Sequence, residues 1–137
     1  MSEINEAPAT GDLTATVDTY LRAWTEPDPD RRAALIESVW SADGRLVDPP
    51  LAAEGHAGIS DLAAALQAQF PGHTFRRASG IDAHHDQLRF AWELVGPDGV
   101  VALTGLDVGE VAPDGRLARV TGFFGTVPAL EPAGSAG

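Results

Sequence analysis

The clearest hydrophobic pattern in the chain is an alternation of apolar and polar positions across residues 87–111. Two apolar-rich runs flank Gly96-Pro97-Asp98-Gly99, a sequence of strong turn formers. Because successive side chains of a strand point to opposite faces, each run presents one apolar face. The pattern therefore predicts a β-hairpin, whose first strand carries Leu88, Phe90, Trp92 and Leu94 on its apolar face.

One acidic residue, Asp107, falls on the apolar face of this hairpin. If Val95 pairs with Val100, Asp107 lies opposite Leu88. An isolated charge is costly to bury, so a carboxyl at such a position requires an explanation. Two explanations stay open: the alternation is shifted by one residue and Asp107 is exposed, or Asp107 is a functional group in an apolar pocket.

The pattern changes from a helical period to a strand period at about residue 73. Apolar positions repeat at helical spacing in three stretches, and Asp12 and Asp30 are the expected N-caps of the first two. A turn at 41–44 and a short strand that Pro49-Pro50 ends lie between the second stretch and the third. The expected helices span about 12–26, 30–40 and 59–70, and the expected strands span 45–48, 73–82, 87–96, 100–111 and 116–126.

This order of elements predicts an α+β fold. We expect a curved antiparallel sheet with three N-terminal helices on its concave face, an arrangement that commonly encloses a pocket. One domain is expected over residues 12–127. The acidic segment 1–11 and the tail 128–137, which consists largely of Pro, Ala, Gly and Ser, are expected to lack order.

The composition narrows the classes of function. The net charge is −11, and all nine basic residues are arginines, which argues against binding to nucleic acid or to anionic membranes. Without lysine there is no Schiff-base chemistry, and without cysteine there is no thiol nucleophile or disulfide. No signal peptide, transit peptide or membrane-spanning run is recognisable, so the expected location is the cytoplasm.

Three stretches carry a resemblance to a known family: DTYLRAW at 18–24, GRLVDPP at 44–50 and GLDVGEVAPDGRLARV at 105–120. Over residues 12–126 the chain resembles the nuclear transport factor 2-like superfamily, in particular its branch of ketosteroid isomerases and SnoaL-like polyketide cyclases. The resemblance implies a cone-shaped, cystatin-like α+β barrel. It also implies a homodimer that forms through the outer face of the sheet, where Ala91 and Val95 lie among charged residues.

The resemblance assigns roles to three residues of this chain. In the isomerases the equivalent of Asp48 is the base, and the equivalents of Tyr20 and Asp107 donate hydrogen bonds to the substrate oxygen. In the cyclases the equivalent of Asp107 is itself the acid–base group, and a histidine one hairpin upstream assists it. Here that place is occupied by Glu93 or a neighbour, so this chain departs from the cyclase pattern.

Other residues complete the predicted site. Trp24, one helical turn after Tyr20, could occupy the same part of the cavity, because the segment between Tyr20 and Asp48 is longer than in the isomerases. His73 is the alternative acid–base partner of Asp107. No histidine or carboxylate spacing typical of a metal site occurs, and no cofactor is expected. The predicted ligand-binding residues are Trp24, His73, Leu88, Phe90, Trp92 and Phe124.

These observations lead to one main hypothesis and two alternatives. The main hypothesis is a cofactor-independent acid–base enzyme, an isomerase or cyclase that acts on a small hydrophobic carbonyl compound similar to a steroid or polyketide. The first alternative is a non-catalytic ligand-binding or dimerisation module on the same fold. The second, epoxide hydrolysis, requires an Asp–Arg–Asp cluster, which is not expected because Arg89 and Arg119 should point outward.

Overall fold

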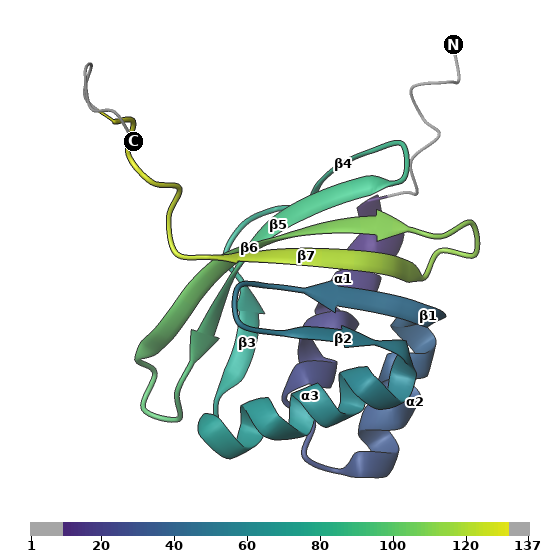
Figure 1. Cartoon of the computed structure of the whole chain (residues 1–137), viewed down its shortest axis with the longest axis horizontal. Helices are drawn as coiled ribbons and strands as arrows, with labels where there is room; N and C mark the ends of the chain where they lie inside the picture. Colours follow the sequence, from purple (N-terminus) through teal and green to yellow (C-terminus); the bar gives the residue numbers. More distant parts are fainter. Residues whose placement is uncertain (1–9, 132–137) are drawn as a thin grey trace.

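The structure, a computed structural model, describes residues 10–131 and has the α+β architecture expected from the sequence. The disorder predicted at the two ends falls largely on residues 1–9 and 132–137, which lie outside the described part. Three helices and seven strands follow one another (Figure 1): α1 (Thr10–Trp24), α2 (Pro29–Val39), β1 (Trp40–Val47), β2 (Ala52–Glu54), α3 (Gly55–Gln69), β3 (Thr74–Arg77), β4 (Asp82–His84), β5 (Gln87–Val95), β6 (Val101–Val111) and β7 (Leu117–Phe124).

The seven strands form one curved sheet in the order β2-β1-β7-β6-β5-β3, and β4 pairs with a further part of β5. Strands β5, β6 and β7 form an antiparallel meander. β1 pairs with β7 in parallel, so the sheet is mixed and not antiparallel throughout as predicted. Figure 1 shows the three helices on one side of the sheet, with α1 passing behind β1 and β7 in this view. Among residues 10–131, no helix combines the length and apolar character that a membrane span requires.

The register of the β5–β6 hairpin differs from the predicted one by two residues. Phe90, and not Leu88, lies opposite Asp107, and Trp92 lies opposite Gly105. The difference arises because the turn is longer and the register shifts between Leu94 and Val95. A displacement of two residues keeps every side chain on its predicted face, so Asp107 still points to the apolar side.

The first half of the chain departs more from the prediction. α1 begins at Thr10, before Asp12, and α2 is capped by Asp28 instead of Asp30. The carboxylate of Asp28 accepts a hydrogen bond of 3.1 Å from the backbone N–H of Asp30, and Pro29 suits the first helical position, where no N–H is needed. The predicted turn at 41–44 is part of β1, and β2 forms in a segment for which no strand was expected.

The predicted strand 73–82 is divided into β3 and β4. The reason lies in the pairing with Ala91 of β5. Its carbonyl accepts from the backbone N–H of Ala78, but its own N–H donates to the side-chain oxygen of Ser79 at 2.8 Å. A side chain thus replaces the backbone partner at this point, and the ladder is interrupted between the two strands.

The C-terminal end of α1 is held by polar side chains from α2 and α3. Gln67 donates hydrogen bonds to the backbone carbonyls of Trp24 and Glu26, at 3.1 and 2.9 Å. Arg32, which is buried, donates to the same Glu26 carbonyl at 2.9 Å and to Ser60 at 3.0 Å. Carbonyls at the end of a helix lack partners within it, and here two other helices supply them. These contacts fix the end of α1 that carries Trp24.

Candidate active site

A pocket opens between the helices and the concave face of the sheet. Its cavity volume is about 60 Å³, room for a few water molecules and below the usual range of small-molecule sites, so a larger ligand must displace lining side chains or extend through the mouth. Two aspartates and one tyrosine provide its polar groups, and the other walls are aliphatic and aromatic. The lining residues are Tyr20, Leu21, Trp24, Leu46, Asp48, Leu51, Leu62, Leu66, Phe75, Trp92, Leu103, Asp107 and Phe124.

Asp107 on β6 is the buried carboxyl of the pocket, with an exposed fraction of 5%. Its Oδ2 accepts a hydrogen bond of 2.8 Å from the hydroxyl of Tyr20, and its Oδ1 accepts one of 3.0 Å from the indole N–H of Trp92. Burial raises the pKa of Asp107 from 3.8 to about 6, although both hydrogen bonds act in the opposite direction. The carboxyl therefore titrates close to neutral pH.

Tyr20 is a hydrogen-bond donor to this carboxyl. Burial and the nearby charge of Asp107 raise the pKa of Tyr20 well above its ordinary value of 10. The hydroxyl therefore keeps its proton throughout the range in which Asp107 titrates. The alternative that Trp24 replaces Tyr20 in the cavity does not apply, because both side chains line the pocket and their rings meet edge to face at 6.0 Å.

Asp48 lies directly after β1, in the turn that leads to β2. Its Oδ1 accepts a hydrogen bond of 3.0 Å from the backbone N–H of Leu51, and its own N–H donates to the Leu51 carbonyl at 3.0 Å. The residue is half-buried. Partial burial raises the pKa of Asp48 from its ordinary value, and the hydrogen bond from Leu51 lowers it. Asp48 is therefore both a turn residue and a carboxyl that faces the pocket.

Gly122 on β7 lies between the two carboxyls. It pairs with Asp107 of β6, and the preceding residue, Thr121, pairs with Val47 of β1, next to Asp48. A Cβ at position 122 would be 2.9 Å from Oδ1 of Asp107 and 3.2 Å from Cβ of Asp48. Because glycine has no side chain, Asp107 and Asp48 can both lie close to β7 at this position. A glycine inside a strand often marks such a close approach between neighbouring groups.

Gly105 has a similar relation to Trp92. The two residues pair across β5 and β6, and a Cβ at position 105 would overlap the indole ring. The indole thus lies over the backbone of β6, and its N–H reaches Asp107 two residues further along the strand. Phe75 and Phe124 meet the same indole edge to face, at 5.2 and 5.8 Å between ring centres. These contacts hold Trp92 in one orientation.

The structure brings six of the predicted site residues together. Asp48, Asp107 and Tyr20 line the pocket, as do Trp24, Trp92 and Phe124. Phe90 is buried beside it, where its ring meets that of Tyr20 at 6.2 Å, and it does not line the cavity. Leu88 lies further along β5 and packs over Gly109, so it belongs to the core. The alternation identified their face but not their distance along the strand from the pocket.

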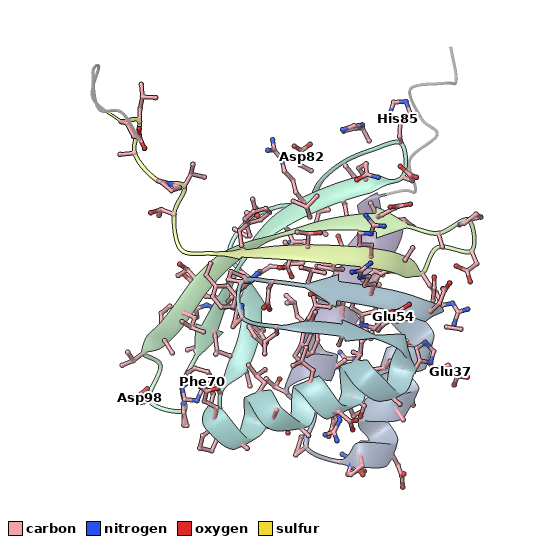
Figure 2. The ribbon with its side chains drawn as sticks, viewed as in Figure 1. Glu37, Glu54, Phe70, Asp82, His85 and Asp98 are labelled. Atoms are coloured by element: carbon pink, nitrogen blue, oxygen red, sulfur yellow. The ribbon has the colours of Figure 1, made fainter. Side chains whose placement is uncertain are left out.

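His73 was predicted to reach the pocket mouth, and the structure places it elsewhere. Its Nδ1 lies 3.1 Å from the carbonyl of Pro71, and its ring packs against Phe70 at 5.4 Å between centres. Figure 2 shows Phe70 at the end of α3, near the β5–β6 turn that carries Asp98. Pairing of β3 with the end of β5 brings His73 to this turn and away from Asp107.

Glu93, the residue at the place of the cyclase histidine, also lies outside the pocket. Its carboxylate forms an ion pair of 2.8 Å with Arg76 on the other face of the sheet. The side chain of β5 that reaches Asp107 is Trp92, one residue earlier. Hence Asp107 has a tyrosine and a tryptophan as partners, and no histidine among the residues that line the pocket.

The apolar lining includes seven residues that the sequence reading did not assign to the site. Leu62 and Leu66 lie on α3, and the packing of that helix brings them to the cavity. The others come from α1, β1, the turn after it, β3 and β6, and their positions depend on how these elements meet. The seven residues are Leu21, Leu46, Leu51, Leu62, Leu66, Phe75 and Leu103.

A metal site and an epoxide-hydrolysing site would each require a cluster of charged side chains. Within residues 10–131, no group of three histidine, aspartate or glutamate side chains is arranged to hold a metal ion. Arg89 pairs with Asp82 at 2.9 Å on an exposed part of the sheet, and Arg119 is exposed. Neither arginine lines the pocket, so an Asp–Arg–Asp cluster is not formed by the lining residues.

Comparison with known proteins identifies relatives by structure. No family model and no curated protein sequence matches the chain. A crystal structure from Agrobacterium tumefaciens, described as a candidate isomerase of the SnoaL-like family, is 36% identical, with a TM-score of 0.80 over 85% of this chain and 99% of the other. A candidate SnoaL-like polyketide cyclase from Jannaschia sp. CCS1 has a TM-score of 0.62 over 81% of this chain and 85% of the other, at 19% identity.

The fold itself is also found in a designed protein. A de novo protein with a curved β-sheet has a TM-score of 0.63 over 86% of this chain and 88% of its own, at 16% identity. At that identity the likeness concerns the fold alone. The Agrobacterium structure carries more weight, because its identity of 36% extends over nearly its whole length. This chain belongs to the SnoaL-like family.

Proposed function

We propose that the protein is a cofactor-independent acid–base enzyme, which moves a proton on a small hydrophobic carbonyl compound. The observation that carries the proposal is the pair of carboxyls, Asp48 and Asp107, on either side of Gly122 in an otherwise apolar pocket. A general acid or base works best when its pKa is near the pH of the reaction, and burial brings the pKa of Asp107 to about 6.

In this proposal Asp48 is the base. It removes a proton from the carbon between the carbonyl and a neighbouring C=C bond, which leaves a dienolate. It then returns the proton to the far carbon of the dienolate, so that the double bond moves into conjugation with the carbonyl. Asp107 in its protonated form and Tyr20 donate hydrogen bonds to the carbonyl oxygen, where negative charge develops. With a pKa of about 6, Asp107 is mostly ionised at pH 7 in the free protein, in contrast to the neutral donor expected from the sequence. A bound apolar ligand expels water and raises the pKa of Asp107 further, which favours the donor form.

A second assignment of roles within the same reaction class makes Asp107 the base. It is favoured by the hydrogen bonds from Tyr20 and Trp92, which both donate to the carboxylate and stabilise its ionised form. The two assignments predict opposite pH dependences of kcat/KM, which reports on the free enzyme. If Asp107 is the donor, kcat/KM falls above about pH 6. If Asp107 is the base, kcat/KM falls below it.

The experiment measures turnover of cyclic β,γ-unsaturated ketones by the absorbance of the conjugated product. Asp48→Asn should lower kcat by about 10²–10⁴-fold, the usual contribution of a general base. Asp107→Asn should keep part of the activity if residue 107 is a donor, because an amide N–H can still donate, and should lose it if residue 107 is the base. Asp82→Asn, an exposed acid on β4, is the matched control and should have no effect. Equal activity of Asp48→Asn and the native enzyme would contradict the proposal.

The rival function is a ligand-binding or dimerisation module without chemistry. In favour of pairing, one row across the outer face of the sheet is apolar: Ala91, Leu106 and Phe123 pair in sequence across β5, β6 and β7. Phe123 in this row is 55% exposed. We therefore also propose a homodimer through this face. A module of this kind would bind hydrophobic ketones by calorimetry and convert none of them, whereas the enzyme would do both.

A further inference from the structure

Among residues 10–131, the two carboxyls of the pocket accept hydrogen bonds from neutral groups and have no positively charged partner. All nine arginines of the chain lie in the described part, and none of them lines the pocket. Five form ion pairs with other acids, and Arg32 donates to Glu26 and Ser60. The four histidines are also absent from the lining. The lining residues therefore make the pocket acidic, and none of them carries a positive charge that would balance the two carboxyls.

The surroundings of Asp107 contain neutral donors and one further acid. α1 contributes the hydroxyl of Tyr20, β5 contributes the indole N–H of Trp92, and β1 leads to Asp48. α3 and β3 contribute only Leu62, Leu66 and Phe75 to the lining, and β7 contributes Phe124. Gly122 of β7 lies next to Asp107 and carries no side chain. An ionised carboxyl in such surroundings gains much from a cation, because opposite charges attract strongly where water is excluded.

We propose that this pocket binds small hydrophobic amines as ammonium ions, with the N–H groups directed at Asp107 and Asp48, and that it rejects carboxylates of the same shape. The hydrocarbon part of the ligand lies among the rings of Trp24, Trp92, Phe75 and Phe124, and indole faces attract cations. The net charge of −11 favours the approach of cations over anions. The proposal specifies the charge of the ligand that the candidate active site binds. It rests on the pocket and not on turnover.

The affinities of the pocket for amines and for ketones should change with pH in opposite directions. An alkyl ammonium ion has a pKa near 10 and stays charged from pH 5 to 8, so Asp107 is the group that titrates. An ammonium ion lowers the pKa of Asp107 in the complex, so amine affinity is highest above pH 6 and falls as the pH decreases through about 6. A ketone excludes water and raises that pKa, so ketone affinity is highest below pH 6 and falls as the pH increases.

The experiment compares three probes with the same bicyclic skeleton: 2-aminoindan, 2-indanone and indan-2-carboxylate. Their affinities for the full-length protein are measured by titration calorimetry at pH 5, 6, 7 and 8. The expected result at pH 8 is binding of 2-aminoindan about tenfold or more tighter than 2-indanone, the factor that one added charge-assisted hydrogen bond contributes. No binding of the carboxylate is expected. Carboxylate binding equal to that of the amine would overturn the proposal.

Two variants and a control test the assigned residues. Asp107→Asn and Asp48→Asn should each lower the affinity for 2-aminoindan about tenfold at pH 8 and change that for 2-indanone little. Asp82→Asn removes the same charge from β4, on an exposed part of the sheet that Figure 2 labels, and should leave both affinities unchanged. If Asp82→Asn weakens amine binding as much as the pocket variants do, net charge and not the site is responsible, and the proposal fails. Since no step measures turnover, this outcome is independent of the catalytic proposal.

Discussion

The hydroxyl of Tyr20 donates a hydrogen bond of 2.8 Å to the carboxyl of Asp107, although 87 positions of the chain separate the two residues. The bond joins the first helix to the middle of the sheet and lies inside the pocket. It also affects the chemistry of the carboxyl, since it favours the ionised form while burial disfavours it. Several measurable properties of the protein depend on this pair and on Gly122 beside it.

Replacement of Tyr20 by phenylalanine should raise the pKa of Asp107 above about 6. The variant removes a hydrogen bond that lowers this pKa and keeps the ring that fills the space. Carboxyl ¹³C chemical shifts followed by NMR against pH measure the change. Loss of a buried hydrogen bond to a charged group should also lower the free energy of unfolding at pH 8 by about 1.5–3 kcal/mol. An unchanged or lower pKa of Asp107 would show that the Tyr20 hydroxyl does not act on this carboxyl.

The stability of the protein should contain a pH-dependent contribution from Asp107. The folded-state pKa, about 6, lies above the ordinary value of 3.8. The folded state therefore binds the proton more tightly, so the contribution is fully present below pH 3.8 and is lost as the pH rises through about 6. A difference of about two pH units corresponds to ~3 kcal/mol for a group buried to this extent.

Urea unfolding of the native protein and of Asp107→Asn at pH 4, 5, 6 and 7 measures this contribution. Other carboxyls titrate in both proteins, so the difference between the two free energies isolates residue 107. From pH 4 to pH 7 the native protein should lose about 2–2.5 kcal/mol of stability relative to Asp107→Asn. A difference that stays constant over this range would mean that Asp107 titrates normally.

Replacement of Gly122 by alanine should disrupt the acidic pair. The new Cβ would lie 2.9 Å from Oδ1 of Asp107, so the carboxyl must move away from its hydrogen-bond partners or the strands must separate. Overpacking of this kind costs about 1–3 kcal/mol of folding free energy. The affinity for a hydrophobic ketone should fall as well. Gly80→Ala is the matched control, because a Cβ there meets nothing within 4 Å. Equal stability and ligand affinity of the two variants would contradict this role of Gly122.

The proposed homodimer depends on Phe123, the exposed aromatic residue in the apolar row of the outer face. Phe123→Thr keeps a residue that suits a strand but removes most of the apolar surface. Sedimentation equilibrium should show a dimer for the native protein. The variant should shift towards monomer, with a dimer dissociation constant at least about tenfold higher. Val100→Thr, in the β5–β6 turn and 62% exposed, should stay dimeric. A native protein that is monomeric at all concentrations would contradict the proposal.

Much of the fold could be predicted because the apolar pattern has a different period in helices and in strands. The alternation along β5 and β6 gave the correct face for Asp107 despite a register error of two residues, since an even displacement keeps every side chain on its face. The position along a strand is not contained in that pattern. For this reason Leu88 and Phe90 were assigned to the pocket, although they belong to the neighbouring core.

The parts that could not be predicted depend on contacts between distant segments. The place of His73 follows from the pairing of β3 with the far end of β5, and the role of Gly122 follows from the pairing of β7 with two other strands. Sequence alone offers several explanations for a glycine in a strand. The first half of the chain gave weaker local signals: Trp40 fitted the apolar stripe of a helix but begins β1.

The parallel pairing of β1 with β7 has a consequence for the synthesis of the protein. β1 is made before β7, so the part of the sheet that carries Gly122 cannot form on a growing chain until β7 has left the ribosome. Contacts between residues so far apart also slow folding, because a long loop must close before they form. The docking of β7 between β1 and β6 therefore brings the two acidic residues of the pocket together.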